Sequence, residues 1–177
     1  LTNTALRHLP PRTMAAITHL FNGIIRTGTF PDSWKRGNVV MFPKAGKNTM
    51  KPESYRPITL LSCLSKVFER LILRHLTPHI KPRPEQFGFR SEHGTSLQLS
   101  RVLHHMTFHR NKKEHLVAVF LDMEKAFDRV WHSGLIFKLA HTSTPRRLVR
   151  VVASFLQDRT FRVRVEGELS STHPIAA

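Results

Sequence analysis

Asp122 stands directly after an uninterrupted apolar run at residues 116–121. Such a run predicts a short strand that is buried on both faces. Functional sites gather at the carboxyl ends of strands in open sheets. Because burying a bare carboxylate is costly, a side chain at that place must be solvated, paired or bound to a metal ion. Asp122 is therefore a candidate metal ligand, and the alternative is an aspartate that ends the strand or caps a helix.

The histidines offer a second metal chemistry. His105 and His109 lie four residues apart on a predicted helix, a spacing that can chelate an ion. The sequence has no His-Glu-x-x-His motif and a single cysteine, Cys63. This excludes an internal disulfide framework and a cysteine-rich zinc module. We expect the histidines to lie at the surface or to face a nucleic acid.

Net charge narrows the choice of partner. The 177 residues hold 28 Lys and Arg against 12 Asp and Glu, a formal charge of +16, and the basic residues are spread from Arg7 to Arg164. Such an excess predicts a polyanionic partner, and nucleic acid is the first choice. The alternatives are a solvated basic surface and a protein that binds an acidic protein surface. The apolar runs are too short to cross a membrane, so no membrane partner is expected.

The apolar pattern predicts helices and strands along the whole chain. Helical spacing predicts helices at residues 11–27, 62–76, 95–110, 133–140 and 145–156, with Met14 and Val67 on their apolar faces. Strand patterns occur at residues 38–42, 116–121 and 161–165, and Glu166-Gly167 turns the last one back toward residues 169–175. Helices packed on a small sheet make an α+β (α/β) fold. No shift in composition divides the chain.

The run at residues 120–131, FLDMEKAFDRVW, resembles the first catalytic motif of reverse transcriptases from non-LTR (LINE-type, jockey-like) retrotransposons. Further pieces follow the pattern of that family in order: Trp34-Lys35, Phe42-Pro43-Lys44-Ala45-Gly46-Lys47, Ser54-Tyr55-Arg56-Pro57-Ile58, Leu60-Leu61-Ser62, Lys66-Val67-Phe68-Glu69, Gln86-Phe87-Gly88-Phe89-Arg90, Ser154-Phe155-Leu156 and Asp158-Arg159. The matches cover nearly the whole chain from about Pro31 onward.

The resemblance implies the fingers and the first part of the palm of a right-hand polymerase. Residues 1–30 would form an N-terminal helical extension, residues 31–115 the fingers with the template- and nucleotide-contacting motifs, and residues 116–177 a partial palm. The implied function is an RNA-directed DNA polymerase that adds deoxynucleotides to a primer by a two-Mg²⁺ mechanism. The alternative is a non-catalytic nucleic-acid-binding remnant of a retrotransposon.

The resemblance also assigns roles at the catalytic motif. Asp122 would be the catalytic carboxylate that bridges two Mg²⁺ ions (or Mn²⁺), and Met123 would add a backbone carbonyl as a metal ligand. Phe127 would lie beneath the sugar of the incoming nucleotide and exclude a ribose 2′-hydroxyl, with plain core packing as the alternative. Asp128 is not the second metal carboxylate of the family, and a cap or an arginine partner is the role we expect for it.

Cations of the fingers complete the implied site. Lys44 and Arg56 would clamp the phosphates of the incoming nucleotide, although Lys47 is an equal candidate by its spacing. Arg90 and Gln86 would lie near the template strand. The implied partners are an RNA template, a DNA primer and deoxynucleoside triphosphates, in the nucleus and cytoplasm, and the oligomeric state stays open.

The second catalytic stretch of the family carries two adjacent aspartates, and this sequence holds no Asp-Asp pair. The chain begins with Leu1 and stops just before that stretch would follow, so we expect a fragment. One carboxylate is too few for two Mg²⁺ ions. We therefore expect these residues alone to lack polymerase activity.

Overall fold

The computed structural model describes residues 3–123 and 126–175. It divides the chain into two compact units: Leu1–Ile80 together with Phe127–Ala177, and Lys81–Ala126. Composition does not mark these boundaries, because both units are basic and mixed in character. The predicted α+β class is confirmed by helices and a small mixed sheet. Each unit is described below by itself.

Five α-helices belong to the first unit, as far as the structure describes it. They are α1 (Asn3–Arg7), α2 (Pro11–Thr27), α3 (Cys63–Leu76), α5 (His132–Ala140) and α6 (Arg146–Leu156), with short 3₁₀ turns at Asp32–Trp34, Pro52–Ser54 and Thr77–His79. All the helices predicted in this unit are confirmed to within a residue or two. Gly28 ends α2 in the left-handed conformation, with φ +73°. No helix in the described ranges is long and apolar enough to cross a membrane.

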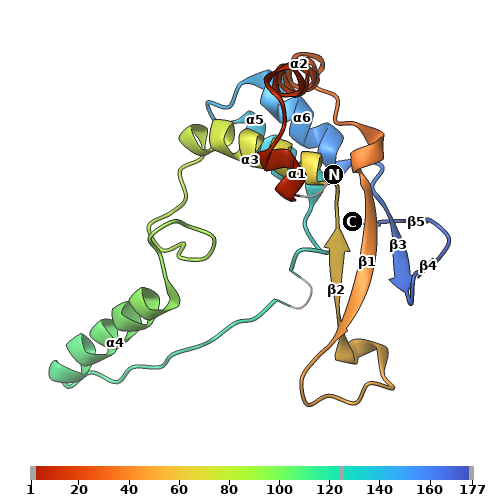
Figure 1. The fold of residues 1–177 in the computed structure, drawn as a ribbon. Coiled ribbons are helices and arrows are strands. Elements are labelled where there is room, and N and C mark those ends of the chain that lie inside the picture. The colour runs from red at the N-terminus through yellow and green to blue at the C-terminus, as the bar shows by residue number, and fades with distance from the viewer. Residues whose placement is uncertain (1–2, 124–125, 176–177) are drawn as a thin grey trace. The chain divides into compact units, whose positions relative to one another are not determined.

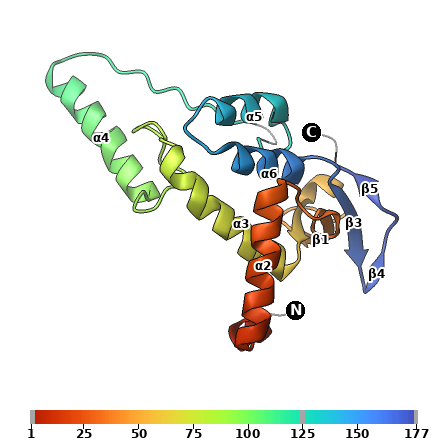
Figure 2. The same cartoon turned by 90° about the horizontal axis from the view of Figure 1, so that it is seen from above.

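The hydrophobic core of this unit lies where α2, α3, α5 and α6 meet (Figure 2). Its buried members are Phe21, Ile24, Phe30, Phe68, Ile72, Leu76, Leu139, Leu148 and Val151. Two residues expected on buried faces, Met14 and Val67, are instead exposed. Val67 points away because one helical step turns it about 100° from Phe68, which faces the core. Met14 lies on the first turns of α2, ahead of the first buried residue of that helix, Phe21.

The sheet contains β1 (Arg36–Pro43), β2 (Tyr55–Leu60), β3 (Thr160–Val165), β4 (Glu168–Leu169) and β5 (His173–Pro174). The strand order is β2-β1-β3-β4, and β5 also pairs with β3. β1 is antiparallel to β2 and parallel to β3. Figure 1 shows the helices of this unit (α1, α2, α3, α5 and α6) gathered beyond one end of the strands, with the loop that joins β1 to β2 at the other end. The predicted strands at residues 38–42 and 161–165 are confirmed.

Strand β2 was not among the predicted strands. In the structure Pro57 lies opposite Met41 on a strand at the edge of the sheet. An edge strand tolerates proline, because its missing N–H can face solvent instead of a neighbouring strand. Of the predicted phosphate-binding residues, Arg56 lies on β2 and Lys44 directly follows β1.

The second unit has one α-helix in its described part, α4 (Thr95–Asn111), which confirms the prediction there. The predicted buried strand at residues 116–121 is wrong, because this segment has no regular secondary structure. Its side chains are exposed, Phe120 by 86% and Leu121 by 92%. A strand exists only by hydrogen bonding to a neighbour, and none of the paired strands in the described residues includes this segment.

Candidate active site

The antiparallel pair β1–β2 brings Lys44 and Arg56 together. Phe42 pairs with Arg56 across the two strands, and Pro43 pairs with Tyr55. The backbone N–H of Lys44 then donates to the carbonyl of Ser54 at 2.7 Å, which continues the pairing by one residue. Lys44 and Arg56 therefore occupy the same face of the hairpin as diagonal neighbours, a relation that separates backbones by about 7–8 Å.

The two cations differ in how their side chains are engaged. Lys44 is half-buried, and its Nζ donates to the carbonyl of Glu53 at 2.7 Å. Arg56 is exposed, and no hydrogen bond or ion pair of its side chain is recorded within the described ranges. Lys47 is exposed on the same loop. The guanidinium of Arg56 can thus meet an anion directly, whereas Lys44 must first release the loop carbonyl.

Asp122 and Met123 lie in the exposed, irregular end of the second unit. The adjoining motif residues Glu124 and Lys125 are outside the described residues. Both the carboxylate of Asp122 and the carbonyl of Met123 are hard oxygen donors of the type that Mg²⁺ prefers. Within the described part of the chain, no group of three or more His, Cys, Asp and Glu residues is arranged to hold a metal ion. The donor chemistry therefore fits a magnesium ion, with further ligands required.

Phe127 and Asp128 follow in a turn at residues 126–129, and both belong to the first unit, which resumes at Phe127. The side chain of Phe127 is 77% exposed, so it is not part of the buried core. Asp128 is also exposed. Because Asp122 belongs to the other unit, the structure fixes no geometry that joins it to Lys44, Arg56 or Phe127.

The loop at residues 83–94 holds Gln86 and Arg90. Arg90 Nη1 donates to the carbonyls of Arg83 and Gln86, both at 3.1 Å, and Gln86 Nε2 donates to the carbonyl of Gly88 at 3.0 Å. These two side chains brace the loop from within. Between them Phe89 adopts a φ of +58° and is 96% exposed. Phe89 is therefore a further candidate for contact with the template. It lies inside the motif at residues 86–90 but was not among the predicted template-binding residues.

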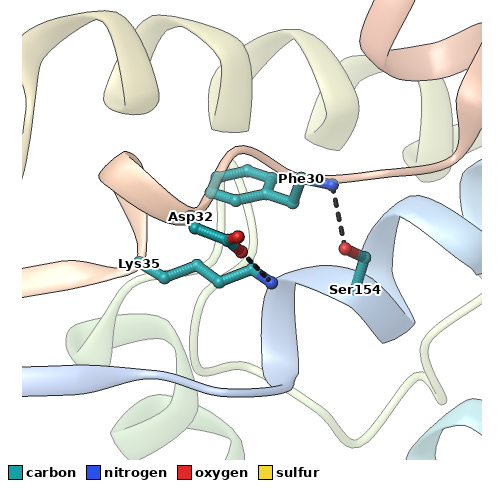
Figure 3. Close-up of polar contacts among 4 residues, drawn as sticks. All are labelled: Phe30, Asp32, Lys35 and Ser154. Atoms are coloured by element: carbon teal, nitrogen blue, oxygen red, sulfur yellow. Dashed lines mark hydrogen bonds and ion pairs between the residues drawn. The ribbon is translucent and has the colours of Figure 1, made fainter.

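Several other motif residues turn out to build the core of the first unit. Trp34 packs edge-on against Phe21 and Phe30 and contacts Phe68, with ring centroids 5.8–6.2 Å apart. Lys35 is buried, 6% exposed, and its Nζ pairs with Asp32 at 3.0 Å (Figure 3). These residues hold the segment between α2 and β1 in place.

The motif at residues 154–159 fastens the same segment from α6. Ser154 Oγ accepts a hydrogen bond from the backbone N–H of Phe30 at 2.9 Å (Figure 3). Phe155 packs edge-on against the ring of Phe30 at 5.0 Å, and the guanidinium of Arg159 lies 4.4 Å from the Phe155 ring. Burial lowers the pKa of Arg159, and the nearby carboxylate of Glu69 partly opposes that shift.

Comparison with known proteins shows the family of this chain. Residues 42–177 match the family described as reverse transcriptase (RNA-dependent DNA polymerase). The chain is 44% identical to the RNA-directed DNA polymerase from mobile element jockey of Drosophila melanogaster, over 100% of this chain and 20% of that protein. It is 43% identical to the probable RNA-directed DNA polymerase from transposon BS of the same species, over 95% of this chain and 19% of that protein.

A third relative is the probable RNA-directed DNA polymerase from transposon X-element of Drosophila melanogaster, 42% identical over 99% of this chain and 20% of that protein. The chain thus spans about a fifth of the length of these relatives. The family match covers more than half of the chain and includes Lys44, Arg56 and Asp122. The chain belongs to the reverse transcriptase family, as a reverse transcriptase domain of the non-LTR retrotransposon type.

Proposed function

We propose that this chain is the fingers and first palm segment of an RNA-directed DNA polymerase, which adds deoxynucleotides to a DNA primer on an RNA template. The observation that carries the proposal is the register of β1 with β2, which puts Lys44 and Arg56 on one face of an exposed hairpin. Family membership supplies the reaction class, and the charge of +16 suits a nucleic-acid partner.

Arg56 is the main phosphate ligand in this proposal. A planar guanidinium can donate two parallel hydrogen bonds to phosphate oxygens, which fixes the orientation of the group as well as its position. Pro57 keeps Arg56 extended, because the residue before a proline disfavours helical backbone angles. Lys44, or Lys47 on the same loop, adds a second positive charge as the triphosphate binds.

Asp122 and the carbonyl of Met123 would hold Mg²⁺, or Mn²⁺, together with ligands from elsewhere in the polymerase. Such an ion supplies stabilisation of negative charge at the attacking and departing oxygens. The exposed carboxylate of Asp122 is accessible to an ion without the cost of burying a charge. With no Asp-Asp pair in the sequence, we expect no incorporation by the 177-residue chain alone in Mg²⁺ or Mn²⁺.

Phe127 and the loop at residues 83–94 would contact the sugar and the template. An exposed phenyl ring below the sugar leaves no room for a 2′-hydroxyl, which would favour deoxynucleotides. Phe89 offers its ring face for stacking on a template base, a contact that tolerates any sequence. Arg90 and Gln86 then act chiefly by holding this loop in shape, with their positive and amide groups near the template.

A graft tests this proposal. The matching fifth of the jockey polymerase is replaced by this chain, and primer extension on RNA is measured against nucleotide concentration. We expect Arg56→Gln to raise the nucleotide KM by at least about tenfold, the size expected for losing a charge-assisted hydrogen bond. Arg74→Gln, which removes another exposed arginine, on α3, should leave KM within about twofold.

The outcomes separate the alternatives. Equal KM values for both variants would show that the hairpin does not hold the triphosphate. A graft that binds an RNA–DNA duplex but never extends the primer would favour the non-catalytic nucleic-acid-binding remnant. A graft with salt-independent or absent duplex binding would favour an acidic protein partner, because phosphate binding weakens steeply as salt rises.

A further inference from the structure

A polar pocket lies between β1, β3 and the residue that precedes β5. Its volume is about 230 Å³, and its lining includes Arg36, Arg162, Ser33, Asn38 and Thr172. Each of these side chains can donate a hydrogen bond. No Asp or Glu is among the residues that line it. The pocket is therefore a concave surface made of hydrogen-bond donors and two positive charges.

The pairing of distant strands creates this pocket. In the parallel pair β1–β3, Arg36 lies beside Thr160 and Asn38 lies beside Arg162. Residues that pair across strands point to the same face of the sheet, so both arginines share that face as diagonal neighbours. The two strands are separated by more than a hundred residues of sequence, which is why no local pattern reveals the pocket.

An irregularity at the sheet edge positions Thr172 in the pocket. Arg164 pairs with Leu169, and Phe161 pairs with His173. Three steps along β3 thus match four steps along the returning segment, so this segment contains one extra residue, as in a β-bulge. Bulges redirect side chains at sheet edges and beside functional sites. Here Thr172 Oγ1 accepts a hydrogen bond from Arg162 Nε at 2.7 Å.

The charges in the pocket lack a counterion within the described structure. Thr172 holds the Nε edge of Arg162 and leaves its terminal nitrogens to the pocket. No hydrogen bond or ion pair of the Arg36 side chain is recorded among the residues that the structure describes. Two guanidinium groups on one small surface repel each other, and an anion between them would turn this repulsion into attraction.

We propose that this pocket binds a phosphate group. Guanidinium forks match the geometry of phosphate oxygens, and the hydroxyl and amide donors of Ser33 and Asn38 can complete its coordination. The pocket is distinct from the Lys44–Arg56 face, because Arg36 and Lys44 stand at opposite ends of β1, roughly 25 Å apart at about 3.3 Å per residue. The phosphate comes either from a nucleic-acid backbone or from a free phosphate compound, and the test below distinguishes the two sources.

The test is a titration of the isotope-labelled 177-residue chain at constant ionic strength. Inorganic phosphate is the first probe, and a single-stranded oligonucleotide without terminal phosphates is the second. Binding is followed by the backbone amide signals of Gly37 and Phe161, two residues that line the pocket. We expect Arg36→Gln and Arg162→Gln each to weaken binding by at least about tenfold.

Arg164→Gln is the matched control. Arg164 lies two residues along β3 on the same face and is exposed, yet it does not line the pocket. This variant loses the same charge and should bind the probe within about twofold of the parent. Thermal unfolding adds a second readout. Arg36→Gln should unfold in chloride at the same temperature as the parent or higher, because it relieves repulsion, but it should lose the phosphate-dependent rise in melting temperature.

Each outcome of the titrations either identifies the source of the phosphate or overturns the proposal. Arginine-dependent binding of the oligonucleotide identifies a backbone phosphate, and arginine-dependent binding of inorganic phosphate alone identifies a free phosphate compound. Absence of binding by both probes, or equal losses in Arg36→Gln and Arg164→Gln, overturns the proposal. None of these readouts measures DNA synthesis. Failure of the polymerase proposal would therefore leave the phosphate-binding result intact, and failure of phosphate binding would leave the polymerase proposal intact.

Discussion

The two units of this chain are built in opposite ways. The unit formed by residues 1–80 and 127–177 buries a cluster of aromatic and aliphatic side chains between four helices. The unit at residues 81–126 has no buried residue in its described part, and α4 exposes Leu99, Leu103 and Met106. One unit can hold side chains rigidly through packing, and the other depends on local hydrogen bonds.

This difference divides the roles proposed for the site. Lys44 and Arg56 lie on a sheet that is continuous with the packed unit, so their separation is set by strand pairing. Asp122 follows an exposed apolar segment in the sparsely packed unit. An exposed apolar segment of this kind is typical of a surface that another part of a protein, or a partner, covers. The geometry of the proposed phosphate ligands is thus set by these residues themselves, while that of the proposed metal ligand depends on additional contacts.

The largest expected effect is on the packed core. Phe68→Ala should lower the free energy of unfolding by about 3–5 kcal/mol, because it leaves a cavity in a fully buried site. Urea unfolding followed by tryptophan fluorescence measures the change, since Trp34 contacts Phe68. Leu103→Ala on α4 is the counterpart in the other unit and should cost under about 1 kcal/mol. Equal costs would contradict the contrast between the units.

A smaller effect is expected where α6 fastens the segment after α2. Ser154→Ala removes the acceptor for the backbone N–H of Phe30, which is partly buried. The expected loss of unfolding free energy is about 1–2 kcal/mol. Ser100→Ala on α4 removes an exposed hydroxyl that bonds only within its own helix and should change stability by less than about 0.5 kcal/mol. Denaturant curves of both variants provide the comparison.

The smallest effect is expected at two glycines. Gly167 has a φ of +97° in the turn between β3 and β4, so Gly167→Ala should cost about 1 kcal/mol through backbone strain. Gly94, at the start of α4, has an extended backbone with φ −103°, and nothing crowds its Cα. Gly94→Ala should therefore change stability by less than about 0.5 kcal/mol. A larger loss of stability in Gly94→Ala than in Gly167→Ala would show that a side chain at position 167 does not strain the turn.

Local sequence patterns predicted most of the helices and strands. Helical spacing located α2, α3, α5 and α6, which each bury part of an apolar stripe, and also α4, whose apolar side chains are exposed. A β-prone run located β1, and alternation located β3. Val67 and Met14 show where the pattern overstates burial, since only part of each apolar stripe meets another element. Pairing could not be derived in this way. Strand β2 and the segment at residues 116–121 were both misjudged, because a strand depends on neighbours that are distant in sequence.

For the candidate site, the sequence predicted individual residues but not their arrangement in space. Family resemblance singled out Lys44 and Arg56, but only the register showed that they share a face. The motifs of the family also include Trp34, Phe68 and Phe155, and the resemblance does not say whether these residues bind a ligand or build the core. Their packing shows that they build the core. Arg36 and Arg162 attracted no attention as a pair, because their proximity arises from a parallel pairing of distant strands.

The central claim is that Asp122 is a metal-binding catalytic carboxylate, and one substitution tests it most directly. In the jockey graft, Asp122→Asn keeps the size of the side chain but removes its charge. Primer extension should fall by at least about a thousandfold, since a ligand of the catalytic metal contributes several kcal/mol. Asp128→Asn, six residues on in the same motif, should retain activity within about threefold. DNA synthesis that continues undiminished in Asp122→Asn, or that is lost equally in Asp128→Asn, would contradict the assignment.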